Sequence, residues 1–492
     1  MMNPFAIIVT VVAYIAAIAF AAWWTGRNAR NMDFFTANRR TSWQWAALAM
    51  IGAAMSGVTF ISIPGSVAAD SFSYMQMVAG FTIGQLVVAF VLVPMFYRQR
   101  VISLYGFLDA RFGAVTRKTG AWCFFVAKIL AASLKIYIVC EVLQWLIFDR
   151  AGIPLVANAA ATMTLVWLYT RRGGVKSLIW TDSIHTICLI VSVVVCTSCL
   201  IKALGWTPAE AANAVAGSQY SQILFFDNPS SDRYFWKMFL AGIFTLVAMT
   251  GLDQDMMQRN LSCRSVRDAQ INIVITAVCQ IFVIFGFLVL GALMYLYMER
   301  SGIPVPAKSD LVFANVAVSD GMPAAVGVMF IIGMVASTWS SAGSALTALT
   351  TSFTLDILPR SAELDEDGLA RRRKRVHAAM AVAICAAIFI FGSLSSGSVI
   401  NLIFTVVSYT YGPILGMFCI GMFTRRAIRD RAMPAIAVAA PAICAAVQYF
   451  AAREMEYHIG FELLIYNAAL TMTGMYLSGV RLRGVDHVKH LK

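Results

Sequence analysis

The sequence predicts an all-α integral membrane protein with about thirteen transmembrane helices. Of its 492 residues, 60% are hydrophobic and only 13% are charged, and the mean hydropathy is +0.74. Soluble domains are roughly half apolar and a quarter charged. Many windows of about 20 residues are almost free of charge, which is the length that a helix needs to cross the bilayer. These runs are too long and unbroken for barrel strands, so the spans are helices.

The hydrophobic runs place the spans along the whole chain. The first run starts without a basic segment or a small-residue cleavage site, so we expect a retained span and not a signal peptide. The spans are expected at residues 4–24, 43–64, 72–97, 119–148, 153–170, 177–201, 234–252, 270–298, 323–352, 376–396, 398–423, 433–451 and 461–480.

The basic residues favour one side of the membrane. Of the 38 Lys and Arg residues, 29 fall in alternate loops and tails, at residues 25–41, 98–118, 171–176, 253–269, 356–377, 424–432 and 481–492. Because basic loops stay in the cytoplasm, we expect a multi-pass protein of the cell inner (plasma) membrane, with its N-terminus outside and its C-terminus in the cytoplasm. This topology and contact with anionic membrane lipid account for the net charge of +13, so no nucleic-acid partner is expected.

Signatures of metal, redox and nucleotide chemistry are weak. The ten cysteines lie mostly singly inside spans, and the five histidines form no ligand pair at helical spacing. The sequence has no phosphate loop, nucleophile elbow or zinc-protease motif. We therefore expect that the protein is not an enzyme and has no cofactor.

The second to sixth and the seventh to eleventh spans form two sets of five. Because five is odd, the two sets enter the membrane from opposite sides, which permits an inverted repeat. Transporters of this kind bind substrate and ions where the first helix of each set is broken. The second span reads ALAMIGAAMSGVTFISIPG (47–65), with small residues at mid-depth, and the seventh has Thr250-Gly251 near its inner end. Both patterns predict a break, although small residues also serve close helix packing.

This repeat divides the chain into five parts. We expect a leading helix and cytoplasmic linker (1–42), a first five-helix repeat (43–202), an extracytoplasmic loop (203–233), a second, inverted repeat (234–423), and two trailing helices with a cytoplasmic tail (424–492). Within the second repeat, the inner loop at 354–377 carries SAELDEDGLARRRKR, an acidic and then basic segment that we expect to be a solvated loop.

A row of hydroxyl side chains runs through the ninth span. Its members lie three or four residues apart and therefore share one helix face: Ser337, Ser340, Ser341, Ser344, Thr347 and Thr351. Such hydroxyls can bond to their own helix or join neighbouring helices. Facing a broken helix, however, they meet the needs of sodium, a hard ion that requires about five oxygens to replace its water. The break in the second span would free the carbonyls of Gly52 and Met55.

Charged residues inside the spans are the other candidates. Asp182 is the only acid in the sixth span. It is interpreted either as an interfacial acid or a contact near the helix start, or as a second cation ligand opposite Ser340 and Ser344. Lys128 lies close enough to the cytoplasmic end to extend to the surface. Lys135 is deeper, and it either pairs with a carboxylate such as Glu141 or faces the cavity to bind an anion.

The segment LDQDMMQR (252–259) contains two acids, Asp253 and Asp255, beside a span end. A D-x-D pair binds metal-phosphate in some membrane transferases. No second acidic motif accompanies this pair, so a metal-dependent membrane transferase is a remote alternative.

Four segments in order together resemble the sodium:solute symporter family. SLYGFLDARFG (103–113) is similar to the signature that follows the family's third membrane span. GLDQDMMQR, STWSSAGSALTALTTSFTLDIL and SYTYGPILGMF (408–418) resemble its later signatures. The likeness covers nearly the whole chain. In the first signature, Gly106 and Asp109 stand where the family usually has acids.

The resemblance implies a LeuT-like fold with one leading and two trailing helices, and transport driven by a sodium gradient. The family's sodium site carries over to the carbonyls of Gly52, Met55 and Ser337 and to the hydroxyls of Ser340 and Ser341. Some members, including bacterial sialic acid transporters, bind a second sodium through an aspartate and serines. Those positions correspond to Asp182, Ser340 and Ser344, whereas Gly343 stands where a further serine is expected.

For the solute, the resemblance favours the sialic acid branch. The second span lacks the Asn and Glu/Gln pattern of hexose carriers and offers Ser56 and Thr59, and the third span begins with Phe72 and Gln76. Lys135 stands where that branch has an arginine that holds the substrate carboxylate. Lysine is a point charge without the bidentate fork of arginine, so the specific acid can differ.

We therefore predict a sodium-coupled symporter that imports a small anionic or polyhydroxylated solute, preferably a sialic acid or related sugar acid, by alternating access. Sodium is the one metal ion expected. A neutral sugar or monocarboxylate symporter of the same fold is the main alternative. A channel is disfavoured because no filter-like repeat is present.

Overall fold

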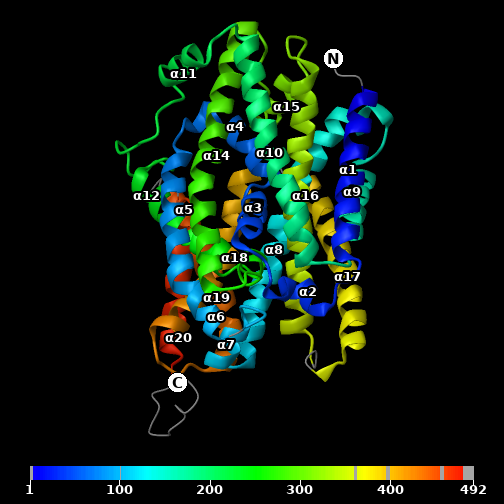
Figure 1. Ribbon diagram of the computed structural model, residues 1–492. Helices are drawn as coiled ribbons and strands as arrows, with labels where there is room; N and C mark the ends of the chain where they lie inside the picture. Colours follow the sequence, from blue (N-terminus) through cyan, green and yellow to red (C-terminus); the bar gives the residue numbers. More distant parts are fainter. Residues whose placement is uncertain (1–3, 100, 360–362, 395–398, 455–458, 480–492) are drawn as a thin grey trace.

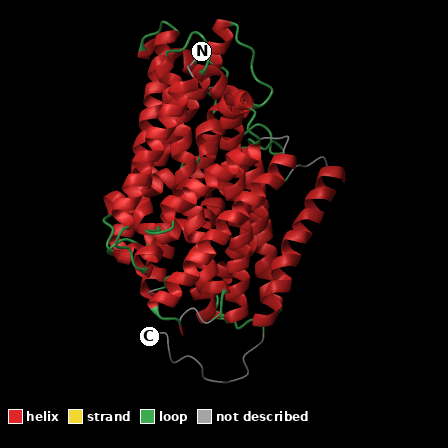
Figure 2. Cartoon of the chain, turned by 90° about the vertical axis from the view of Figure 1, so that its right-hand side faces the viewer, coloured by secondary structure: helices red, strands yellow, loops and turns green. Residues whose placement is uncertain are grey.

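The computed structural model describes residues 4–99, 101–359, 363–394, 399–454 and 459–479. Within these ranges the chain is helical, and the one β-type contact is an isolated pairing of Thr41 with Cys263. Figure 2 shows the long helices standing roughly side by side, with loops collected at the two ends of the bundle. The predicted all-α fold class is therefore confirmed.

The helices follow the hydrophobic runs closely. Those that correspond to the expected spans are α1 (Pro4–Gly26), α3 (Trp43–Ala54), α4 (Gly57–Asp70), α5 (Tyr74–Val87), α6 (Val93–Gln99), α8 (Ala114–Leu143), α9 (Leu155–Thr170), α10 (Val175–Ala203), α12 (Phe235–Leu246), α13 (Gln254–Asn260), α14 (Val266–Ser301), α16 (Ala324–Ser352), α17 (Glu366–Leu394), α18 (Val399–Phe423), α19 (Met433–Glu454) and α20 (Leu463–Leu477). Shorter helices lie between them, at α2 (Asn31–Thr36), α7 (Gly106–Arg111), α11 (Pro208–Ala216) and α15 (Val312–Ala317).

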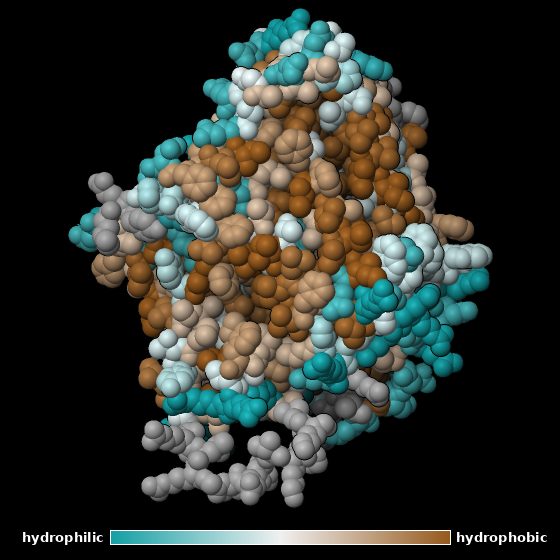
Figure 3. All heavy atoms as spheres, turned by 60° about the vertical axis from the view of Figure 1, so that its left-hand side comes forward, coloured by the Kyte–Doolittle hydropathy of each residue, from teal (hydrophilic) through white to brown (hydrophobic). Residues whose placement is uncertain are grey.

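Among the described residues, eight helices are long and apolar enough to cross a membrane, and two bent pairs raise this number to ten. The helices α9 and α20 are apolar but shorter. Figure 3 shows a broad apolar surface across one face, with hydrophilic side chains gathered mostly toward its ends. These observations agree with a multi-pass membrane protein, whereas the count of thirteen spans remains a prediction.

The two predicted helix breaks are confirmed. Helices α3 and α4 meet at an angle of 54°, and α12, extended to Gly251, meets α13 at 68°. At the first break Met55 and Ser56 leave the helical conformation. At the second, Asp253 is extended and its side chain accepts a hydrogen bond from the Asp255 N–H, which caps α13. Each bent pair therefore has free backbone groups inside the bundle.

The first break lies at the centre of the molecule. Helices α3 and α4 pack against α14 and α16, and α3 also packs against α10. Figure 1 shows α3 and α4 in the middle of the bundle, with α14 on one side and α10 and α16 on the other. Free carbonyls at this break are therefore enclosed by protein and not by lipid, as a broken membrane helix requires.

Two segments expected to be loops are helical. Residues 366–377, within the expected solvated loop, form the first turns of α17, where Glu366 and Asp367 lie at the helix start. Acids at a helix N-terminus are stabilised by the helix dipole, and the arginines that follow are good helix formers. Residues 254–260 form α13, which is buried and not a cytoplasmic loop. The first segment is helical but still largely exposed, so only its assignment as a loop was wrong. The second was wrong in both respects, because its charged residues lie inside the protein.

Candidate sodium and solute site

Small residues let three helices approach the break between α3 and α4. A Cβ added to Gly52 would lie 2.3 Å from Oγ1 of Thr186 in α10. A Cβ added to Gly57 would lie 2.2 Å from Oγ1 of Thr338 in α16 and 2.9 Å from Val139 in α8. The glycines of the second span therefore bring α8, α10 and α16 directly against the break.

The row of hydroxyls predicted in the ninth span lies on α16 and is buried. Four members bond to their own helix, because Ser337, Ser344, Thr347 and Thr351 donate to backbone carbonyls 2.9 to 3.1 Å away. Ser340 and Ser341 differ from them. Their Oγ atoms are buried, and within the described part of the chain neither has a hydrogen-bond partner of good geometry.

The pair of unsatisfied hydroxyls is informative because such groups are costly. A buried polar group without a partner costs about 1–3 kcal/mol. Ser340 is fully buried, lies beside the Asp182 carboxylate and forms no well-directed hydrogen bond to it. Two buried hydroxyls without partners, on the helix that packs against the broken pair α3–α4, are a donor set that suits a hard cation.

Asp182 is fully buried near the start of α10, so it is not an acid exposed at the interface, whereas a contact near the helix start agrees with its pairing with Arg259. Its Oδ2 lies 2.8 Å from Nη2 of Arg259, whereas Oδ1 has no partner among the described residues. Asp182 therefore already has a counter-ion within the protein. A cation bound here would share this carboxylate with Arg259.

Arg259 belongs to a chain of buried charges that links α10, α13 and α8. Its Nη1 lies 2.5 Å from Asp255, and Nζ of Lys128 lies 2.8 Å from Asp255 and 2.9 Å from Asp253. The Tyr411 hydroxyl of α18 donates to Asp253 at 2.5 Å. This buried charge network fixes α13 against the helices around the break.

The network corrects two expectations and adds one residue. Lys128 does not extend to the surface: it is 8% exposed and paired with both acids. Asp253 and Asp255 are held by cations and are not a free D-x-D pair. Arg259 was not among the candidates, although its spacing of four from Asp255 in a segment following a predicted break indicates a helical ion pair.

Lys135 lies seven residues along α8 from Lys128 and is half-buried. Among the described residues it forms no hydrogen bond or ion pair. Glu141, its candidate partner, lies 2.5 Å from Nζ of Lys308. The expected pairing with Glu141 is therefore wrong, and the Lys135 ammonium has no counter-ion in contact.

The remaining solute candidates fall into two groups. Ser56, at the break, and Thr59, in the first turn of α4, form no side-chain hydrogen bond within the described part of the chain. Gln76, by contrast, donates to the Arg233 carbonyl at 2.9 Å and accepts from the Phe225 N–H at 3.1 Å.

Both hydrogen bonds of Gln76 hold the loop between α11 and α12 in place, so its amide is not free to bind a solute in this conformation. Phe72 joins the same loop, because its N–H donates to the Gln222 carbonyl, and its ring packs edge-on against Phe285. A cavity of about 340 Å³ lies beside these contacts, and Ser73, Tyr74, Met238 and Ser408 are among its lining residues.

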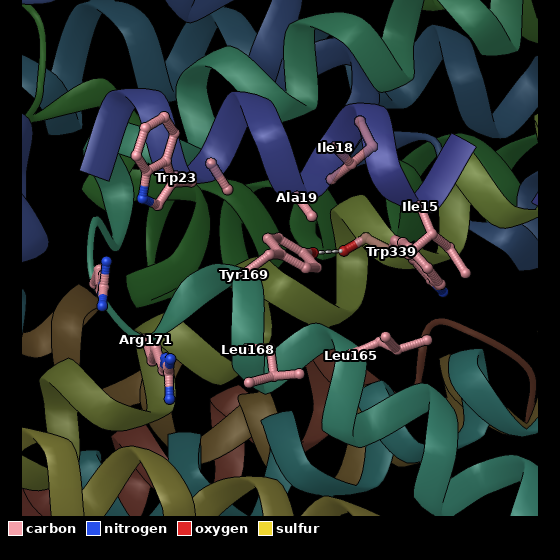
Figure 4. A pocket seen from close by; sticks show the side chains of 11 residues that line it. Ile15, Ile18, Ala19, Trp23, Leu165, Leu168, Tyr169, Arg171 and Trp339 are labelled. Atoms are coloured by element: carbon pink, nitrogen blue, oxygen red, sulfur yellow. Dashed lines mark hydrogen bonds between the residues drawn. The ribbon is translucent and has the colours of Figure 1, made fainter. Parts of the chain in front are cut away.

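Gly343 has a structural explanation. The Tyr169 hydroxyl of α9 donates to the Trp339 carbonyl of α16 at 2.5 Å, and Figure 4 shows this bond within a pocket between α1 and α9. A Cβ at position 343 would lie 2.2 Å from this hydroxyl oxygen. Residue 343 is therefore a glycine because tyrosine fills the space that a serine side chain would need.

The chain is similar to several known proteins. The sodium:solute symporter family model matches residues 34–438. The human sodium/iodide cotransporter is 24% identical over 400 residues, which cover 80% of this chain and 61% of that protein. The human sodium-coupled monocarboxylate transporter 1 is 25% identical over 414 residues, which cover 81% of this chain and 65% of that protein. The chain thus spans about three fifths of the length of these relatives.

Two solved structures share its fold. A Na+-coupled sialic acid symporter, in a substrate-bound outward-open state, superimposes with a TM-score of 0.81 at 18% identity, covering 96% of this chain and 97% of the other. Mhp1, a nucleobase-cation-symport-1 family transporter, superimposes with a TM-score of 0.51 at 16% identity, covering 90% of this chain and 94% of the other. These likenesses confirm the LeuT-like fold. With the family match over most of its length, the chain belongs to the sodium:solute symporter family.

Proposed function

We propose that this protein is a sodium-coupled symporter that imports a small anionic or polyhydroxylated solute, preferably a sialic acid or related sugar acid, by alternating access. The observation that carries the proposal is the pair of buried, unsatisfied hydroxyls of Ser340 and Ser341 on α16, the helix that packs against the broken pair α3–α4. The membrane is the plasma membrane, with basic loops on the cytoplasmic side.

Sodium binds between α16 and the break. The hydroxyls of Ser340 and Ser341 and the carbonyls of Gly52, Met55 and Ser337 supply about five oxygens, enough to replace the hydration shell of the ion. Neutral ligands hold the ion without trapping it, so it can leave where sodium is scarce.

The site couples the binding of ion and solute because its ligands come from two separate elements, α16 and the broken pair α3–α4. Sodium draws α16 toward the broken helix and favours the conformation that is ready for solute. Solute then favours closure of the outer side and opening of the inner side. Such coupling requires that each ligand bind the two conformations with different affinities.

Asp182, Ser340 and Ser344 form a candidate second sodium site. The free Oδ1 of Asp182 and the unsatisfied Oγ of Ser340 support it. Arg259 opposes it, since its guanidinium already neutralises part of the carboxylate. A second ion therefore binds only as the Asp182–Arg259 contact loosens.

The unpaired ammonium of Lys135 favours an anionic solute, with Ser56 and Thr59 as hydroxyl partners near the break. The names of the two human relatives, cotransporters of iodide and of monocarboxylates, also point to anions. Phe72 and Gln76 would join the solute site only after the loop that they hold moves away. A monocarboxylate or neutral sugar carrier remains the alternative, and because Lys128 and Arg259 hold Asp253 and Asp255, a transferase is disfavoured.

Uptake into proteoliposomes tests the proposal. A panel of labelled sialic acids, hexoses and short acids is measured with and without an inward sodium gradient. S340A/S341A should abolish sodium-stimulated uptake. T347V is the matched control, because the Thr347 hydroxyl already bonds its own helix. Unchanged uptake by S340A/S341A would overturn the sodium assignment, and loss of uptake in T347V would show that the effect is not specific.

A further inference from the structure

A basic hollow lies where the segment between α1 and α3 meets the first turns of α10 and the loop after α13. Its volume is about 660 Å³. Four cations from these three segments line it, namely Arg30, Arg40, Lys176 and Arg264, and among the described residues Asp33 is the one acid in its lining.

The positive charge of this hollow is largely unbalanced. Asp33 is already engaged, because it accepts from the Arg30 N–H at 3.0 Å and from the Asn38 amide at 2.6 Å and lies 3.7 Å from Nζ of Lys176. Within the described residues, the guanidinium groups of Arg30, Arg40 and Arg264 form no ion pair. Several exposed cations in one concavity repel one another, and a bound anion would relieve that repulsion.

Indole rings place the hollow at the edge of the hydrocarbon. Trp45 and Trp180 line it with ring centroids 4.4 Å apart, and each is about 40% exposed. Trp23 and Trp24 are exposed near the end of α1, just before the segment that contributes Arg30. Tryptophan collects at the level of the lipid headgroups. Basic pockets between membrane helices at this level bind anionic lipid headgroups.

We propose that this hollow binds the phosphate headgroup of an anionic phospholipid from the leaflet on the basic side of the membrane. The cations contact the phosphate, and the exposed indoles contact the start of the acyl chains. A soluble anion would use the cations alone and would gain nothing from the apolar rim.

The hollow also joins the inner ends of both broken spans. The Thr41 N–H donates to the Ser262 carbonyl at 3.0 Å, and the Arg264 N–H donates to the Thr41 carbonyl at 3.2 Å. These bonds tie the segment entering α3 to the segment leaving α13. Lys176 adds α10, the helix that carries Asp182. A headgroup held by Arg40, Lys176 and Arg264 therefore stabilises the present arrangement of all three helices and resists its rearrangement during transport.

The test measures lipid binding directly. The full chain is placed in phosphatidylcholine nanodiscs, and bound fluorescent phosphatidylglycerol is titrated. Near a membrane each cation contributes about fivefold in affinity, so R40Q/R264Q should weaken binding about 25-fold. The matched control is R425Q/R429Q, which removes the same charge from exposed positions outside the hollow.

Two further measurements show whether the variants are folded and whether the hollow binds a lipid or a soluble anion. Phosphatidylglycerol should raise the Tm of the wild type and of R425Q/R429Q, and should not raise that of R40Q/R264Q, while all three share one Tm without it. Equal binding by R40Q/R264Q and the control would overturn the proposal. So would displacement of the lipid by millimolar inorganic phosphate, because the site would then be one for soluble anions.

Discussion

The hydroxyl of Tyr169 occupies the space that a side chain at position 343 would need. Its oxygen lies 2.2 Å from the ideal Cβ position of Gly343 and donates to the Trp339 carbonyl, one residue before Ser340. Tyr169 thereby holds α9 against the helix that carries the proposed sodium ligands. The resemblance to the family implies a serine hydroxyl at residue 343. Here the hydroxyl of Tyr169, from a neighbouring helix, fills that space.

G343A should therefore destabilise the protein. The added methyl group meets a buried, hydrogen-bonded ring that cannot move freely, and overpacking of this kind costs about 1–3 kcal/mol. Thermal unfolding of the purified protein measures the effect. G343A/Y169F, which removes the clashing oxygen, should recover part of the loss.

G286A is the matched control for this substitution. Gly286 also lies inside a long helix, but the nearest atom to its added Cβ is 3.8 Å away. Alanine should be neutral or stabilising there, by up to about 1 kcal/mol. Equal Tm values for G343A and G286A would contradict the packing explanation.

Arg259 and sodium should compete for Asp182. R259Q removes the internal counter-ion and leaves a buried carboxylate unpaired, which costs about 3–5 kcal/mol. Sodium can then take the place of the guanidinium. Added NaCl should raise the Tm of R259Q more than that of the wild type, with choline chloride as the salt control.

D182N removes the carboxylate for which sodium and Arg259 compete. It should therefore weaken sodium binding, where R259Q strengthens it, and should reduce the Hill coefficient of sodium-dependent uptake. R300Q is a suitable control, because Arg300, near the end of α14, donates to the Leu204 carbonyl just after α10 and forms no ion pair in the described structure. If sodium shifts the Tm of R259Q, R300Q and the wild type equally, no second sodium binds at Asp182.

Lys128 should contribute to stability through its two aspartates. K128M would leave Asp253 and Asp255 with one fewer cation in the membrane interior, at a cost of about 3–5 kcal/mol. K118M, at an exposed position on the first turns of α8, should have little effect. Chemical labelling gives an independent check, since a lysine at the membrane surface would react with amine reagents and Lys128 should not.

The sequence predicted the helices well because one signal, hydrophobicity over about 20 residues, determines them in a membrane. Both breaks were also predicted, since small residues and Thr250-Gly251 weaken a helix locally. The serines of α16 were recognised by their spacing, but spacing cannot tell which hydroxyls are satisfied. That distinction required the coordinates around Ser340 and Ser341.

The buried charges were predicted less well. Lys128 was expected at the surface because it lies close to the cytoplasmic end of its span. Nothing in the local sequence indicated that Asp253 and Asp255, beside the end of another span, would meet it. The bend between α12 and α13 returns these acids to the interior. Likewise, the pairing of Asp182 with Arg259 joins residues 77 positions apart, which no local pattern in one sequence reveals.

Lys135 should determine the charge of the transported solute. A charge-assisted hydrogen bond to a carboxylate contributes about 1.5–3 kcal/mol, so K135A should raise the KM for an anionic solute by about 10- to 100-fold. The KM for a neutral analogue of the same size should change little. K135R should retain affinity for the anion. The control is K202A, which removes an exposed charge at the end of α10. Competition uptake in proteoliposomes with charged and neutral analogues measures both values. An equal rise in KM for the two analogues would show that Lys135 supports the structure and does not bind the anion.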